Sequence, residues 1–518
     1  MTDGHEPLCL AIDLGTGGLK VGVVSLEGRV AAQELHAVST DYGAGGAATQ
    51  DAGAWWRSIS DAARRILSRE DIRAHDVSAV AVTGQWSSTV PVDANGVPTG
   101  PCVMWMDSRG GPHTRRLVGG KVQGYRPAAI TRWITKTGGA PSTSGDDPIG
   151  HLLYLLHDEP ELVARTSWFL EPVDYLTMRF SGVASACHAS MQGAWLTDNR
   201  RLDVLEYDPD LVGTLGIPTD KLPPLHPIGS VVGHVQDAVA DDLGLRRDVA
   251  VITGLPDLQA AAVGAGAVVP YAAHLALSTT SWISCPVPKK HTDAFHSIAT
   301  VPGLSNDSYL LVNNQETGAK ALEWIRGILA GGGVALDYDE LSQLALAADP
   351  GAGGVLFTPW LAGERSPVDD RSARGGFTNL SLSTTTADIV RSVFEGVAYN
   401  SRWLLGYVEK FAKRRLDPIR LVGGGARSAL WCQVYADVLN RRVEQVQDPM
   451  FAQLRGMAVV AGVALGHRRL EDTAAVLPAT RAFEPDAARA ARYDELAEEV
   501  PALYAEGKKR WRRLNRDR

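Results

Sequence analysis

The stretch that most limits the possible folds lies near the N-terminus, where residues 8–24 read LCLAIDLGTGGLKVGVV. An apolar run of strand length leads to Asp13, a loop rich in glycine follows, and valines return directly after it. Because Val21–Val24 and Arg29–Gln33 read as two more strands, the segment predicts an antiparallel meander and not a strand–helix–strand unit. An acid at the end of a buried strand is costly unless something pairs with it, so the loop must bring a partner to Asp13.

The composition of this loop suits an oxyanion. A hairpin turn of small residues exposes backbone N–H groups close together, and such a nest binds phosphate oxygens. The residues that would form the nest are Gly15, Thr16, Gly17, Gly18 and, as a source of positive charge, Lys20. A nucleotide-borne Mg²⁺ ion, held through water, would then be the partner of Asp13. The same letters also fit a plain glycine hairpin with a solvated aspartate, since short glycine motifs often arise by chance.

Strand and helix patterns alternate along the rest of the chain, which predicts α/β layers. Asp51 is placed to cap a helix, and Val77–Val82 reads as a strand. The segment LALSTTSWISC, residues 275–285, repeats the opening pattern of strand, small polar turn and strand. Two halves that each start with a hairpin would make a duplicated, two-lobed protein. A chain of 518 residues is long enough for this, since it exceeds what one hydrophobic core supports.

Composition excludes some classes of partner. The net charge of −8 argues against nucleic acid or an anionic membrane. The 5 cysteines are scattered without metal-binding spacing, so we expect buried free thiols in a reducing cytoplasm. The first residues do not resemble a signal peptide, and the longest apolar runs are too short to span a bilayer.

Five blocks, in order along the chain, resemble the FGGY family of carbohydrate kinases, within the larger group that includes heat-shock 70 proteins and actin. The blocks are DLGTGGLKVGVV, TGQWSS with VMWMDSR, ITGLPDLQAAAVGAGAV, PWLAGERSP with ARGGFTNLSLS, and LVGGGARSALWCQVYADVLNRRVE. The resemblance extends from about Leu8 to Gly466. GERSP and ARGGF belong to this family in particular.

This resemblance implies an α/β protein with two ribonuclease-H-like (actin-like ATPase) domains flanking a central cleft. Residues 1–258 would be the sugar-binding domain and residues 259–518 the nucleotide-binding domain. Mg²⁺ would accompany ATP, with Asp13 and Asp257 as its ligands. The residues that the resemblance assigns to ATP are Gly15, Thr16, Gly17 and Lys20 in the first loop, Thr279, Thr280 and Gly318 in the second lobe, and Gly424, Gly425 and Ser428 beside the adenosine.

Asp257 is the residue that we expect to carry the chemistry. It follows a strand, and in the resembling family the matching aspartate is the general base that accepts the proton of the sugar hydroxyl. A helix N-cap is the alternative interpretation, and both roles can hold together.

The acceptor site is assigned to Gln85, Trp86, Trp105 and Asp107, where amide, carboxylate and indole groups suit a polyol. The alternative interpretation makes Trp105 a core residue and Asp107 the ion-pair partner of Arg109. The chain also departs from the pattern of xylulose kinases, which usually read GQMHG where this chain has GQWSS. Ser278 replaces a glycine usual in the second phosphate loop, which adds a Cβ where backbone approaches phosphate.

The resemblance therefore predicts an enzyme that uses ATP and Mg²⁺ to phosphorylate a hydroxyl of a small ketose or polyol, with xylulose-type pentuloses favoured. A degenerate relative that binds sugar or nucleotide in a regulatory role, without turnover, is one alternative. An ATPase that drives conformational change is another, although the sugar-side blocks count against it. The expected partners are the sugar and ATP, without nucleic acid or membrane, and a homodimer is compatible with the sequence.

Overall fold

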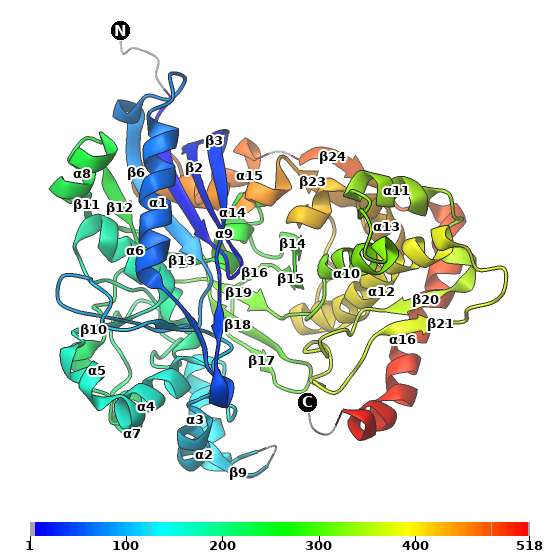
Figure 1. Cartoon of the computed structure of the whole chain (residues 1–518), viewed down its shortest axis with the longest axis horizontal. Helices are drawn as coiled ribbons and strands as arrows, with labels where there is room; N and C mark the ends of the chain where they lie inside the picture. The colour runs from blue at the N-terminus through cyan, green and yellow to red at the C-terminus, as the bar shows by residue number, and fades with distance from the viewer. Residues whose placement is uncertain (1–5, 123, 478, 516–518) are drawn as a thin grey trace.

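The predicted N-terminal meander is present and begins the sheet of the first lobe (Figure 1). The computed structural model describes residues 6–122, 124–477 and 479–515. β1 (Leu8–Leu14) pairs antiparallel with β2 (Gly18–Ser25), which pairs antiparallel with β3 (Val30–Ala37). All of β1 is buried, as expected for an inner strand that is covered on both faces.

Parallel strands extend this sheet on the other side of β1. β6 (Val77–Gly84) pairs in parallel with β1, and β12 (Ala250–Ile252) pairs in parallel with β6. β11 (Val231–His234) closes the edge, and the short β13 (Leu255–Pro256) pairs with the end of β6. Because the carboxyl ends of parallel strands meet at one edge of a sheet, the residues after β1, β6 and β13 come together there.

Helices cover one face of this sheet through an apolar stripe. Asp51 caps α1 (Ala52–Leu67) as predicted, since its carboxylate accepts the N–H of Ala54 at 3.1 Å. Trp55 and Ile59 of α1 and the residues of α6 (Pro172–Ser181) pack in one core with the side chains of that sheet face. This burial follows the helical period that the sequence shows.

The second lobe repeats the arrangement, which confirms the predicted duplication of a two-lobed α/β protein. Its sheet has the order β15 (Ser281–Ser284), β14 (Ala273–Leu277), β22 (Ile419–Val422), β23 (Val443–Val446) and β24 (Ala479–Phe483). β14 and β15 form the second hairpin, and β22 pairs with β14 in parallel, as β6 does with β1. The helices in the core of this lobe are α12 (Thr386–Ala412), α13 (Ala429–Leu439) and α16 (Ala487–Leu514).

Each lobe sends one helix to its boundary with the other lobe, and we call these two the exchanged helices. α9 (Asp257–Gly264) contributes to the core of the first sheet and, through Ala261, also packs with Ala276 of β14. α14 (Ala452–Ala464) follows the strands of the second lobe and packs with Cys9 and other residues of the first sheet. The two helices meet at very short range, since a Cβ on Gly264 would lie 1.7 Å from the carbonyl oxygen of Ala452.

A smaller sheet of the second half also reaches the first lobe. It consists of β16 (Pro286–Val287), β19 (Tyr309–Val312), β18 (Ile298–Pro302) and β17 (Thr292–Asp293). Beside it, Lys290 donates to the carbonyl oxygen of Ile134 in α3 (Pro127–Thr137) at 2.9 Å. The α2 (Gly111–Val118), α3 and α4 (Pro148–Asp158) helices form the lower part of the first lobe in Figure 1.

The cysteines behave as predicted, since all five are buried and free. Among the described residues, none of the helices is both long enough and apolar enough to cross a membrane.

Candidate active site

The first glycine loop joins β1 to β2 at the edge where the parallel strands end. The N–H of Gly15 donates to the carbonyl oxygen of Gly18 at 2.8 Å, which closes the turn. A Cβ on Gly17 would meet no atom within 4 Å, so the backbone is open to a ligand on that side. The carbonyl oxygen of Thr16 accepts a hydrogen bond from the side-chain amide of Gln50 at 2.9 Å, which holds the backbone of the loop. The loop thus has the open, ordered backbone that a phosphate nest requires.

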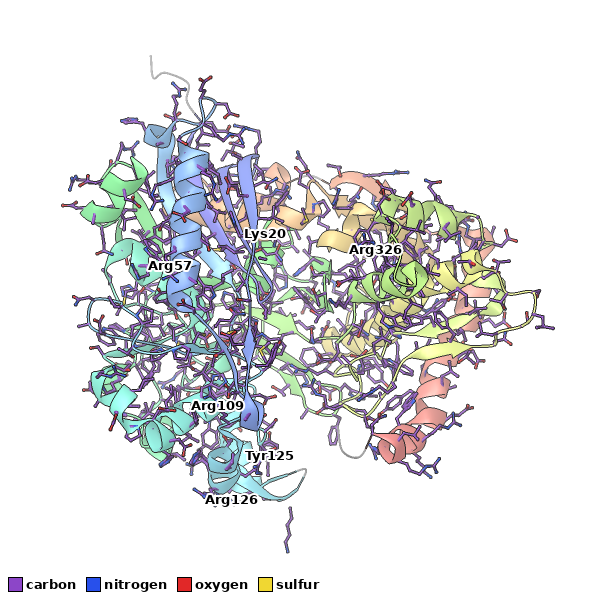
Figure 2. The ribbon with its side chains drawn as sticks, in the orientation of Figure 1. Lys20, Arg57, Arg109, Tyr125, Arg126 and Arg326 are labelled. Atoms are coloured by element: carbon purple, nitrogen blue, oxygen red, sulfur yellow. The ribbon has the colours of Figure 1, made fainter. Side chains whose placement is uncertain are left out.

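Asp13 has a protein partner. It lies directly opposite Lys20 in the hairpin register, and the Lys20 Nζ atom is 2.6 Å from Asp13 Oδ2. Asp13 is only 3% exposed, so its buried carboxylate has the oppositely charged partner that burial requires. Figure 2 labels Lys20 at the side of the first lobe that borders the second lobe. The sequence analysis predicted that Lys20 binds phosphate and that Asp13 binds Mg²⁺. In the structure, the side chains of Lys20 and Asp13 bind each other.

Asp257 lies beside this pair as the first residue of α9, after Pro256 at the N-cap position. Burial raises the pKa of its carboxyl group to about 7, and the negative charge of Asp13 adds to the rise. The Leu258 N–H, the charge of Lys20 and the Trp86 side chain act in the opposite direction. The structure therefore brings two predicted ligands of Mg²⁺, Asp13 and Asp257, into one electrostatic cluster. Because Pro256 occupies the N-cap position and no side-chain bond caps the helix, the alternative interpretation of Asp257 as the N-cap is wrong.

Three of the predicted acceptor residues surround this cluster. Trp105 donates its indole N–H to Thr16 Oγ1 at 3.1 Å and is 37% exposed, so the alternative interpretation of Trp105 as a core residue is wrong. Gln85 donates to Gln50 Oε1 at 3.1 Å, while its own Oε1 is buried without a hydrogen-bond partner in the described part of the chain. Trp86 is half-buried next to Asp257. An unpartnered acceptor and two indoles are suitable groups for a polyol.

The environment of Asp107 differs from that of the other predicted acceptor residues. Its side chain is buried and its Oδ2 accepts both Arg109 Nη2 at 2.7 Å and the N–H of Ala48 at 2.9 Å. Oδ1 accepts the N–H of Arg109 at 3.0 Å. With both oxygens engaged, the alternative interpretation as an ion-pair partner of Arg109 describes this geometry, and a bond from Asp107 to a sugar remains only a prediction.

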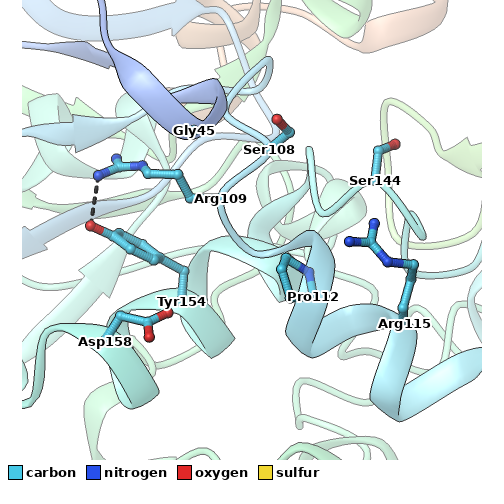
Figure 3. Close-up of a pocket in the computed structure, with 8 residues that line it drawn as sticks. All are labelled: Gly45, Ser108, Arg109, Pro112, Arg115, Ser144, Tyr154 and Asp158. Atoms are coloured by element: carbon cyan, nitrogen blue, oxygen red, sulfur yellow. Dashed lines mark hydrogen bonds between the residues drawn. The ribbon is translucent and has the colours of Figure 1, made fainter.

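A cavity of about 540 Å³ lies beyond Arg109. Figure 3 shows its lining residues, Gly45, Ser108, Arg109, Pro112, Arg115, Ser144, Tyr154 and Asp158. The Arg109 guanidinium stacks on the Tyr154 ring at 4.2 Å and donates to its hydroxyl group at 2.6 Å. None of the predicted site residues is among these described lining residues, although Arg109 joins the cavity to Asp107 through their ion pair.

The second loop, Ser278–Thr280, connects β14 to β15 and is held by its own neighbours. The N–H of Gly318 donates to the carbonyl oxygen of Thr279 at 2.9 Å. A Cβ on Gly318 would lie 2.4 Å from the carbonyl oxygen of Thr280. Gly423 has a φ of +94° and approaches the side chain of Ser278, since a Cβ there would lie 2.6 Å from Ser278 Oγ. Glycine is required at both positions by close contact with this loop.

The last group of predicted residues follows β22. Gly424 is exposed, and a Cβ on it would meet no atom within 4 Å. Ser428 caps α13, since its Oγ accepts the N–H of Trp431 at 3.3 Å. A Cβ on Gly425 would lie 2.6 Å from Leu277 Cγ, just before the second loop. The predicted nucleotide residues of the second lobe therefore gather around the end of β14.

Comparison with known proteins identifies the chain. Residues 8–264 match the N-terminal domain of the FGGY family of carbohydrate kinases, and residues 278–465 match its C-terminal domain. The chain belongs to this family. This FGGY kinase is an ATP-dependent sugar phosphotransferase, as the resemblance predicted.

The similar proteins agree on the fold. A xylulose kinase of Staphylococcus epidermidis is 26% identical over 507 residues, which cover 97% of both chains. The crystal structure of a gluconate kinase from Lactobacillus acidophilus has a TM-score of 0.85 at 20% identity and covers 99% of this chain and 100% of its own. A ligand-bound xylulose kinase from the same organism has a TM-score of 0.84 at 20% identity and covers 97% and 98%. The predicted actin-like fold with two lobes is therefore confirmed.

The residues of this FGGY kinase would suit a Mg²⁺ ion that is held jointly with the phosphates of ATP. The described residues contain no group of three or more His, Cys, Asp or Glu side chains that could hold a metal alone. Mg²⁺ keeps several waters and binds one or two carboxylates together with substrate phosphates. The cluster of Asp13 and Asp257 beside the first loop has this composition.

Two residues of the structure were not predicted: Gln50, which holds two predicted site residues, and Glu364, which is buried in the second lobe. Gln50 links Thr16 to Gln85, and Glu364 of the GERSP block is a buried acid that accepts the N–H groups of Glu316 and Arg365 at 3.0 and 2.9 Å. Burial raises the pKa of Glu364 to about 7. A lone glutamine or glutamate carries no local signal of such tertiary contacts.

Proposed function

We propose that this FGGY kinase transfers the γ-phosphoryl group of ATP to a hydroxyl of a small ketose or polyol, with a xylulose-type pentulose as its substrate class and Asp257 as the general base. The observation that carries the proposal is the position of Asp257, half-buried beside Asp13, Lys20 and Trp86 at the mouth of the first glycine loop. The xylulose kinases among the similar proteins support the choice of a pentulose.

The chemistry needs a group that accepts one proton. The acceptor hydroxyl oxygen forms a bond to the γ-phosphorus, the bond from that phosphorus to the leaving oxygen of ADP breaks, and the hydroxyl proton passes to the Asp257 carboxylate. A pKa of about 7 leaves much of this carboxylate ionised at neutral pH while making it a stronger base than an ordinary aspartate.

Both lobes supply groups for the nucleotide. Backbone N–H groups of the first loop and hydroxyl groups of the second loop would hold the phosphates, and the exposed Gly424 lies on the adenosine side. Lys20, whose Nζ atom lies 2.6 Å from Asp13 Oδ2, would exchange this bond for one with a phosphate oxygen when ATP binds at the first loop. Mg²⁺ bound to ATP would neutralise phosphate charge beside Asp13 and Asp257.

The division into a sugar-binding domain, 1–258, and a nucleotide-binding domain, 259–518, is part of this proposal.

A panel of acceptors tests the proposed substrate class. ADP release would be measured with ketoses, polyols and sugar acids, and we expect the highest kcat/KM with a pentulose. A sugar acid at the top of the panel would contradict this substrate class. Thermal shifts with sugar or ATP but no ADP release from any compound would favour the regulatory alternative.

The pH dependence of kcat/KM tests the role of Asp257. Because the carboxylate must be deprotonated to act as a base, we expect kcat/KM for the acceptor to fall about tenfold per pH unit below about pH 7. Above that pH it should reach a plateau. A rate that stays level between about pH 5 and pH 8 would show that no group with this pKa limits the reaction.

The expected homodimer is a separate prediction. Sedimentation velocity of the purified chain would test it, with a single species of twice the chain mass as the expected result.

A further inference from the structure

The loop after β6 carries two of the predicted acceptor residues, Gln85 and Trp86, and its backbone is strained. It runs from Gln85 to Thr89, with Trp86 beside Asp257. Ser87 has a φ of +63°, a left-handed conformation that non-glycine residues rarely adopt. Such a conformation persists only where surrounding contacts hold it, so the loop requires an anchor.

Glu171 provides that anchor from outside the loop. It precedes α6 and is only 2% exposed. Its Oε2 accepts the N–H of Ser88 at 3.1 Å, and the carboxyl group also receives a bond from the backbone of Ser87. Its other oxygen, Oε1, is buried without a hydrogen-bond partner among the described residues. A buried glutamate whose contacts are backbone N–H groups of one loop holds that loop directly.

The anchor extends to the first phosphate loop. Ser88 Oγ accepts the N–H of Trp105 at 2.9 Å, and the Trp105 indole donates to Thr16 Oγ1 at 3.1 Å. Glu171, Ser88, Trp105 and Thr16 therefore form a chain of contacts from the interior to the candidate active site. On the other side, a Cβ on Gly193 would lie 3.0 Å from the Ser87 side chain, so the loop has little room to relax there.

We propose that Glu171 is a positioning residue for the sugar acceptor: by holding the backbone of Ser87 and Ser88, it fixes Trp86 and Trp105 where the acceptor binds. The inference rests on the proposed function in one respect, that this loop contacts the acceptor. It concerns affinity for the sugar more than affinity for the nucleotide, since Glu171 bonds directly to Ser87 and Ser88 and reaches Thr16 of the first phosphate loop only through Ser88 and Trp105.

The electrostatics of Glu171 indicate which substitution should preserve its role. Burial, together with the nearby Asp174, raises the pKa of its carboxyl group well above the ordinary value, despite the opposing backbone bonds. Glutamine has nearly the same shape as glutamate and keeps a side-chain oxygen that can accept the backbone N–H groups of Ser87 and Ser88.

The test compares Glu171→Ala, Glu171→Gln and Asp174→Ala. Asp174 is a control because it is also buried, at 1% exposed, and makes no hydrogen bond to this loop among the described residues. We expect Glu171→Ala to raise KM for the acceptor by about tenfold or more, with a smaller effect on KM for ATP. Glu171→Gln should behave like the wild type, and Asp174→Ala should lower the melting temperature without changing the ratio of the two KM values.

Hydrogen exchange provides a readout that needs no turnover. We expect the peptide that covers residues 85–89 to exchange faster in Glu171→Ala than in the wild type or in Asp174→Ala. If Glu171→Ala does not fold, Glu171→Met keeps the volume and apolar character of the site and removes the acceptor oxygens. The proposal would be overturned if Glu171→Ala and Asp174→Ala changed KM for the acceptor and the exchange of residues 85–89 equally. It would also be overturned if Glu171→Gln raised KM for the acceptor as much as Glu171→Ala does.

The choice of acceptor keeps this test separate from the proposed substrate class. The KM values are measured with whichever panel compound has the highest kcat/KM. If that compound is not a pentulose, the substrate proposal fails, while the effect of Glu171 on acceptor affinity can still be confirmed or refuted.

Discussion

Asp257→Asn should lower kcat by about 10²- to 10⁴-fold, the range typical for removal of a general base. Asparagine has nearly the same shape as aspartate but cannot accept the hydroxyl proton at this position. Binding of ATP, measured by calorimetry, should remain close to that of the wild type because the two glycine loops are unchanged. Asp257→Ala should have the same effect on kcat, which would show that charge and not size is responsible.

Asp257→Asn should also stabilise the folded protein at neutral and higher pH. The folded-state pKa of Asp257 is raised, to about 7, so folding favours its protonated form. The stability associated with that proton is fully present below the unfolded-state pKa and is lost as the pH rises toward about 7. The melting temperature of Asp257→Asn should therefore exceed that of the wild type at pH 8 more than at pH 4. Wild-type turnover in Asp257→Asn would contradict the role of this residue as the base.

The second large effect is expected at the contact of the two exchanged helices. Gly264→Ala places a Cβ 1.7 Å from the carbonyl oxygen of Ala452, and a backbone atom cannot move aside cheaply. α9 and α14 must then separate, which disturbs the core between the lobes and the helix that carries Asp257. We expect the melting temperature to fall by about 5 °C or more, with a loss of activity at moderate temperature.

A matched control comes from a helix without such contact. Gly327 lies in α10 (Lys320–Ala330), where an added Cβ would meet no atom within 4 Å. Gly327→Ala should therefore leave the melting temperature unchanged or raise it slightly, since alanine favours helix. If Gly264→Ala were as stable as Gly327→Ala, the close packing of the two exchanged helices would be refuted.

The local elements of this FGGY kinase were predictable from its sequence. Short apolar runs such as Leu8–Ile12 and Ile419–Val422 are strands in the structure, and Asp51 caps the helix that its position predicted. The two hairpins were recognisable because small residues separate apolar strands in both. These features depend on neighbours along the chain, which a sequence displays directly.

The pairing of Asp13 with Lys20 was also present in the sequence, although it was not inferred. The two residues are equally far from the centre of the first turn, so a hairpin places them opposite one another. The equal spacing of the two residues from the turn predicts their pairing, because a hairpin places such residues on facing positions of its two strands.

Contacts between distant segments were not predictable. Alanine and glycine in α9 and α14 indicate close helix packing, but they do not show that α14 packs with the first sheet or that α9 packs with residues of both sheets. Trp105 was open to interpretation as a core residue, yet it is exposed because it lies in a turn beyond the short strand β8 (Cys102–Val103). Glu171 and Gln50 act through tertiary contacts that no local pattern records.

A crystal structure with a non-hydrolysable ATP analogue and the best acceptor of the panel tests the central claim most directly. We expect the reacting hydroxyl oxygen about 3 Å from the Asp257 carboxylate, with the phosphates between the two glycine loops. An acceptor bound elsewhere, such as in the cavity lined by Arg109, or an Asp257 side chain turned away from the acceptor, would contradict the role of Asp257 as the general base.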